Sequence, residues 1–191
     1  MSNITSIIQG CIEPAFELPR EQECWVIKED NPGAANKKLL VNGNGIYGFS
    51  LDCSSVPKPV WKFLKPSALS GMSSVCDGIF VTTYNSIDYF IVIDLKSTKA
   101  SGATKQVVTG IHLCQWIYSV LNLHGHLQRS VKFIGVISKL SKRTQASKRT
   151  TARAPLPDPD IHYSYPIYRL NDYNRISLTE ICKNIEARRI S

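Results

Sequence analysis

The sequence has no C-x-x-C pair, and none of its six cysteines has a histidine at the spacing of a zinc finger. A structural zinc site is therefore not expected, because such sites need four closely placed sulfur or nitrogen ligands. We expect the cysteines to be reduced and partly buried thiols, as in an intracellular protein.

Long apolar runs are also missing. None approaches the length of a membrane span, and the N-terminal stretch MSNITSIIQGCIEP lacks the charged and apolar regions of a secretory signal. We therefore expect a cytoplasmic protein with no membrane contact. The length of 191 residues suits a single domain covering residues 1–191.

Acidic residues are in the minority, with 15 against 23 basic residues, a net charge of +8 and a pI near 9.2. This balance favours an anionic partner, of which nucleic acid is the first candidate. The charge is concentrated in a predicted basic loop at residues 139–157, where the candidate phosphate-binding residues are Lys142, Arg143, Lys148, Arg149 and Arg153. The alternative is a solvated loop without a partner.

The apolar patterns predict an α/β fold with a mixed central β-sheet flanked by helices. Two glycines and two asparagines at residues 42–45 predict a hairpin between the apolar stretches on either side. Adjacent antiparallel strands are predicted at residues 75–83 and 89–97, then a helix over residues 104–121 capped by Thr104, and a strand at 132–138. A strand and a helix follow within residues 163–190, the helix starting at a capping box, Ser177 with Glu180.

Two aspartates and a lysine stand out in the predicted strand pair. The stretch DYFIVIDLKS ends an apolar strand with Asp94 and Lys96, which alternation places on one face of the sheet. A hairpin alignment brings Asp77 of the preceding strand to the same region. Two buried carboxylates repel unless a cation lies between them, and oxygen ligands suit Mg²⁺ or Mn²⁺. A nearby lysine then suits metal-assisted phosphodiester hydrolysis.

Asp77 is followed after 16 residues by Asp94-Leu95-Lys96, and then by a small-residue link and a helix. This arrangement resembles the PD-(D/E)xK nuclease superfamily over residues 75–140. The resemblance implies a restriction-endonuclease-like fold in which Asp77, Asp94 and the Leu95 backbone carbonyl bind Mg²⁺, or Mn²⁺ as a substitute. Lys96 would then orient the attacking water. Cys76 stands where the family has proline, and Glu13 is the favoured candidate for a further, upstream acidic ligand.

The RecB-like branch of these nucleases adds a Q-x-x-x-Y motif on the following helix. In this chain Gln115 and Tyr118 are separated by two residues, one fewer than in that motif, and Gln106 lies earlier on the same helix. These three are the candidate supporting residues.

The resulting expectation is a magnesium-dependent deoxyribonuclease, an endonuclease of restriction or anti-phage defence that acts on DNA as a homodimer or with a partner protein. Three alternatives stay open. In the first, the protein is a nucleic-acid-binding module, and in the second it is a catalytically silent subunit of a larger complex. In the third, Asp94 and Lys96 form an ordinary ion pair at a strand end.

Overall fold

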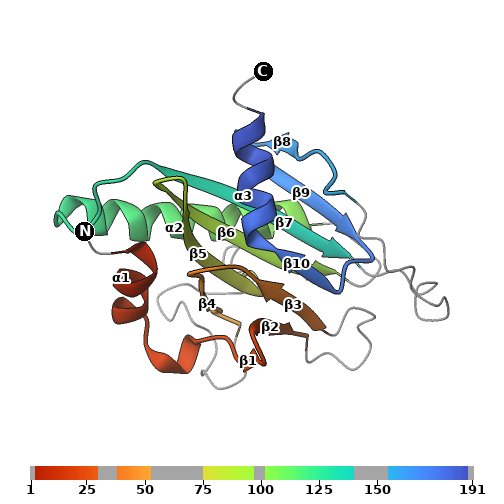
Figure 1. The fold of residues 1–191 in the computed structure, drawn as a ribbon, viewed down its shortest axis with the longest axis horizontal. Coiled ribbons are helices and arrows are strands. Elements are labelled where there is room, and N and C mark those ends of the chain that lie inside the picture. The colour runs from red at the N-terminus through yellow and green to blue at the C-terminus, as the bar shows by residue number, and fades with distance from the viewer. Residues whose placement is uncertain (1–2, 30–37, 53–74, 97–101, 140–154, 189–191) are drawn as a thin grey trace, which may run out of the picture.

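The structure is a computed structural model and describes residues 3–29, 38–52, 75–96, 102–139 and 155–188. Within these residues the chain is mixed α/β, with two mixed β-sheets and three α-helices (Figure 1). The expected α/β class is confirmed at this level, but the strands are divided between two sheets where one central sheet was predicted. No helix among the described residues is long and apolar enough to cross a membrane.

The larger sheet contains the predicted strand pair at its centre. Its strand order is β4-β5-β6-β7-β9-β8. The bounds are β4 (Tyr47–Phe49), β5 (Gly78–Tyr84), β6 (Ile87–Lys96), β7 (Val131–Lys139), β8 (Asp160–His162) and β9 (Tyr165–Asn171). Strand β6 is fully buried from Asp88 to Leu95, as its apolar sequence predicts.

The expected order of strand, strand, helix, strand is confirmed. β5 and β6 form an antiparallel hairpin through Asn85 and Ser86, whose φ angles of 48° and 62° suit a two-residue turn. α2 (Ala103–Leu123) then crosses over to β7, which pairs with β6 in parallel. The predicted cap at Thr104 is wrong. Gly102 occupies the N-cap position with φ 87°, while the Thr104 hydroxyl accepts a hydrogen bond from Arg169.

Two glycines allow α2 to approach the sheet closely. A Cβ atom at Gly110 would lie 2.7 Å from Val92 Cγ1 on β6, and one at Gly135 on β7 would overlap Val107 of the helix. This places the even-numbered side chains of β6 beneath α2. α3 (Leu178–Ala187) covers the other face (Figure 1), where Tyr89 donates a hydrogen bond to Glu186.

The smaller sheet has the order β1-β2-β3-β10. Its strands are β1 (Arg20–Glu21), β2 (Cys24–Lys28), β3 (Lys38–Asn42) and β10 (Arg175–Ser177). The two sheets meet through apolar side chains, including Trp25 of β2 and Phe80 of β5, whose ring centroids are 6.5 Å apart. The helix start predicted at Ser177 is confirmed, because its hydroxyl accepts a hydrogen bond from the Glu180 amide.

The hairpin predicted around residues 42–45 is wrong, because β3 and β4 belong to different sheets. Both edges of β3 are paired, one with β2 and the other with β10, so no edge is left for β4. The glycine-rich turn does form, with φ 57° at Gly45, but it carries the chain from one sheet to the other. β4 instead pairs with β5.

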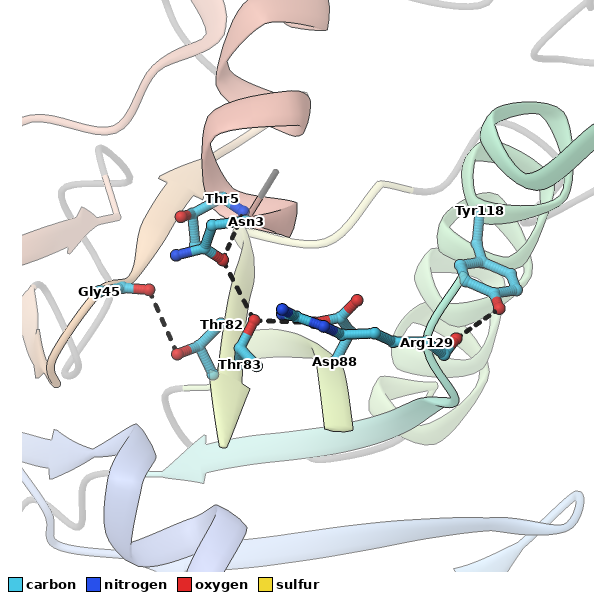
Figure 2. A network of polar contacts seen from close by, with 8 residues as sticks. All are labelled: Asn3, Thr5, Gly45, Thr82, Thr83, Asp88, Tyr118 and Arg129. Carbon is cyan, nitrogen blue, oxygen red and sulfur yellow. Dashed lines mark hydrogen bonds and ion pairs between the residues drawn. The ribbon is translucent and has the colours of Figure 1, made fainter. Parts of the chain in front are cut away.

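A polar network holds the turn end of the β5–β6 hairpin (Figure 2). The Thr83 hydroxyl lies 2.7 Å from Asp88 Oδ1 and 3.1 Å from Asn3 Oδ1, and Asn3 caps α1 (Ile4–Cys11). Arg129 completes the network 3.7 Å from Asp88. The buried carboxylate at the start of β6 is thus compensated by groups of the protein itself.

Candidate active site

The strand register brings Asp77 and Asp94 together. The last pair of the β5–β6 ladder is Gly78 with Ile93, so the next residue along each strand is an aspartate. The Asp77 carboxylate accepts a hydrogen bond from the Leu95 amide. Because the amide and carbonyl of a strand residue point to the same neighbouring strand, the Leu95 carbonyl also points toward the Asp77 side. The three expected oxygen groups therefore share one region of the sheet.

Lys96 is held beside Asp94 by two neighbours. Its Nζ atom lies 2.9 Å from Asp94 Oδ2 and 3.2 Å from Oδ1, and it donates a hydrogen bond of 2.6 Å to Gln106 Oε1. Gln106 reaches this position because it precedes Gly110 by one helical turn on the face of α2 that lies against the sheet. Lys96 keeps 19% of its side chain exposed, so the side chain remains partly accessible from solvent.

Burial dominates the electrostatics of the two carboxyl groups. Desolvation, followed by the charge of Asp94, raises the pKa of Asp77 to about 7. Desolvation also raises the pKa of Asp94 to about 6, although the ammonium of Lys96 opposes the rise. Asp94 Oδ2 is buried and lies 2.9 Å from the Lys96 ammonium, without the geometry of a hydrogen bond. A further cation beside the two carboxylates would offset the cost of ionising both.

Two further acidic residues act on this site, and the sequence reasoning did not identify them. The charge of Asp52 contributes to the raised pKa of both Asp77 and Asp94, and the charge of Glu29 contributes to that of Asp94. Asp52 follows β4, which pairs with β5, and Glu29 follows β2 of the smaller sheet. Their proximity to the site depends on the pairing of β4 and on the packing of the two sheets, which no local sequence motif indicates.

Several predicted residues lie elsewhere. Glu13 is exposed, just beyond α1, as the residue that precedes the short 3₁₀ helix Pro14–Phe16. Gln115 accepts a hydrogen bond from Tyr165, and Tyr118 donates one to the Arg129 carbonyl. Of the three helix residues expected to support the site, the structure brings only Gln106 to Lys96.

The predicted phosphate-binding residues Lys142, Arg143, Lys148, Arg149 and Arg153 lie outside the described residues. Lys139 and Arg169 are basic residues on the face of the sheet under α2. Lys139 pairs with Lys96 in the parallel register of β6 and β7, so the two side chains share the face under α2. Arg169 on β9 donates hydrogen bonds to Asp160 and Thr104.

The residues present fit a hard divalent cation only in part. Two carboxylates and a backbone carbonyl are the oxygen ligands that Mg²⁺ prefers, and Mg²⁺ commonly keeps several waters. Among the described residues, however, no three His, Cys, Asp or Glu side chains gather closely enough to form a metal site by themselves. Asp77 and Asp94 are thus the two side chains available to such an ion, with Asp52 and Glu29 within electrostatic range.

Comparisons with family models, curated proteins and solved structures found no match to this chain.

Proposed function

We propose that this protein is a metal-dependent nuclease of the PD-(D/E)xK type with a restriction-endonuclease-like core. The observation that carries the proposal is the convergence of Asp77, Asp94 and Lys96 at the ends of two adjacent strands. Asp94 is buried and Asp77 is half-buried, and the pKa values of both carboxyl groups are raised toward neutrality. Groups perturbed in this way concentrate at functional sites.

Each residue of the site has a distinct role. Asp77 and Asp94 hold Mg²⁺, or Mn²⁺ in its place, with the Leu95 carbonyl as a third oxygen. When bound, the ion supplies positive charge that offsets the charge developing on the phosphate. Lys96, oriented by Asp94 and Gln106, donates a hydrogen bond to the attacking water or to a phosphate oxygen.

The substrate we propose is DNA, cut internally by a cytoplasmic enzyme of restriction or anti-phage defence. The net charge of +8 supports a polyanionic substrate, and Lys139 extends the basic surface beside Lys96. One site cuts one strand, so cleavage of both strands requires a second copy of the chain or a partner protein.

A second candidate function is a catalytically silent subunit that binds nucleic acid. It is favoured by one observation, that no third acidic side chain completes a metal-binding group among the described residues. This candidate predicts DNA binding that weakens steeply with salt and that neither needs nor responds to a divalent metal.

The deciding experiment incubates the purified protein with plasmid and oligonucleotide DNA in Mg²⁺, Mn²⁺ or chelator. The variants are Lys96→Ala and, as a matched control, Lys183→Ala, which removes the same charge from an exposed position on α3. We expect metal-dependent cutting by the wild type and by Lys183→Ala but none by Lys96→Ala. Cutting that survives Lys96→Ala would contradict the proposed site, and binding without metal or cleavage would establish the silent subunit.

A further inference from the structure

The outer face of α2 carries an exposed apolar stripe in the C-terminal half of the helix. Trp116, Val120 and Leu123 are 64%, 37% and 81% exposed, and Leu113 at the start of the stripe is partly buried. The intervals between the four residues are three, four and three positions, which places them along one side of a helix. Together they expose on the order of 400 Å² of apolar surface, a patch size that often marks an interaction site.

The stripe lies in a part of the chain that has no charge. Residues 106–128 contain no Lys, Arg, Asp or Glu, although charged residues make up 20% of the sequence. Its exposed neighbours Ser119 and Asn122 are polar but uncharged. A nucleic acid or an anionic membrane surface would be bound through Lys or Arg, which this face lacks. An aromatic residue in a surface depleted of charge is instead typical of the centre of a protein–protein interface.

The helix that carries the stripe is held firmly on the larger sheet. Tyr118 donates a hydrogen bond of 3.0 Å to the Arg129 carbonyl (Figure 2), and Gln115 accepts one of 3.0 Å from Tyr165 on β9. A partner would therefore meet a preformed surface, which lowers the entropic cost of binding. Gln106, the residue of α2 that contacts Lys96, lies nearer the other end of the helix, so the stripe is separate from the candidate active site.

The pattern of the stripe is the same in both directions along the helix. An antiparallel second copy of α2 therefore places Leu113 against Leu123 of that copy, and Trp116 against its Val120. The two-fold axis passes near Tyr118, and each large indole ring meets a smaller valine side chain. Such a contact uses one surface twice, as in the most common class of soluble oligomer. It also brings two chains of net charge +8 together at a face without like charges.

We infer that this stripe is the contact surface of a homodimer in which the α2 helices of two copies pack antiparallel. Each copy contributes roughly half of the ~800 Å² per partner that an interface of standard size buries. The dimer is therefore reversible, with a Kd of about 1 to 100 µM. The inference does not depend on the nuclease proposal, because no residue of the stripe belongs to the Asp77 and Asp94 site.

Sedimentation velocity of the full chain in chelator, at concentrations from about 1 to 300 µM, tests the inference. We expect the wild type to change from monomer to dimer over this range. Trp116→Lys and Val120→Glu should each raise the Kd at least tenfold, because each places an unpaired charge in the contact. The matched control is Ile161→Glu on β8, which changes an equally exposed apolar residue on the sheet face opposite to α2 and should leave the Kd unchanged.

An equimolar mixture of Trp116→Lys and Val120→Glu tests the antiparallel arrangement directly. In an antiparallel heterodimer, the lysine introduced at position 116 of one copy meets the glutamate introduced at position 120 of the other. The second contact between Trp116 and Val120 is unchanged. We expect the mixture to associate at least tenfold more tightly than either variant alone. All three substituted positions are exposed, so each variant should keep the melting temperature of the wild type.

Three results would overturn the inference. The first is a wild type that stays monomeric at the highest concentration, in which case a different protein or none covers the stripe. The second is a dimer whose Kd is unchanged by both Trp116→Lys and Val120→Glu, because the contact would then lie on another surface. The third is a mixture that associates no more tightly than its two components.

Discussion

Replacing Asp77 with asparagine should stabilise the metal-free protein at neutral and alkaline pH. The carboxyl group has a pKa of about 7 in the folded protein, against 3.8 when unperturbed. The unfolded chain releases this proton near pH 4 and the folded protein only near pH 7. The free energy of unfolding contributed by Asp77 therefore falls as the pH rises between these values and is lowest above pH 7.

The size of the effect follows from the shift in pKa. Each pKa unit corresponds to about 1.4 kcal/mol, so a rise of this size corresponds to about 4 kcal/mol at most. Asparagine avoids this cost and keeps an oxygen that can accept the hydrogen bond from the Leu95 amide. We expect Asp77→Asn to be more stable than the wild type by roughly 2 to 4 kcal/mol at pH 8, and about equally stable at pH 4.

Urea denaturation in chelator at pH 4, 6 and 8 measures this difference. The control is Asp88→Asn at the other end of β6, where Thr83 and Arg129 compensate a carboxylate that is more deeply buried than that of Asp77. That variant should lose stability at pH 8, because an ion pair and a hydrogen bond are weakened together. If Asp77→Asn is also destabilised at pH 8, or if its advantage does not grow with pH, the electrostatic account of the site is wrong.

Mg²⁺ should raise the melting temperature of the wild type more at pH 8 than at pH 5.5, because metal binding needs the ionised carboxylates. An equal rise in melting temperature at both pH values would contradict a site at Asp77 and Asp94. Gln106→Ala should lower kcat several-fold with little change in stability, because it frees the Lys96 ammonium from one of its two neighbours; unchanged cleavage would show that Gln106 does not orient Lys96. Asp52→Asn should weaken Mg²⁺ affinity measured by calorimetry, and unchanged affinity would exclude a role for its charge. Gly135→Ala should lower the free energy of unfolding by about 1 to 3 kcal/mol, because the added methyl group would overlap α2. Gly10→Ala, which has open space around it, should not lower it, and equal urea midpoints for the two variants would refute the close packing.

The centre of the fold was predictable because its signals are local. β5, β6, α2 and β7 follow one another in the chain, each has a clear apolar period, and their connections leave one plausible pairing. The placement of Asp77 opposite Asp94 depends only on that hairpin register. For this reason the sequence was sufficient to bring the two carboxylates and Lys96 together.

The remainder depended on contacts between distant segments. Nothing near β3 in the sequence indicates that β10 occupies one of its edges, so a hairpin with β4 was the natural but incorrect prediction. For the same reason the sequence did not indicate Asp52 or Glu29, whose charges act on Asp94. Asp52 is positioned by the pairing of β4, and Glu29 is positioned by the smaller sheet. On α2, spacing alone favoured Gln115 and Tyr118, but the close approach at Gly110 selects Gln106 instead.

The parallel pairing of β10 with β3 has a consequence for biosynthesis. β3 and β10 are neighbours in the smaller sheet, but all strands of the larger sheet and α2 lie between them in the sequence, so β3 leaves the ribosome long before β10 does. Until then one edge of β3 is open to pairing with another chain, and the face that α3 will cover lacks that cover. The growing chain therefore depends on the segment from β10 through α3 to close this edge against aggregation, and the smaller sheet can be completed only after that segment has been synthesised.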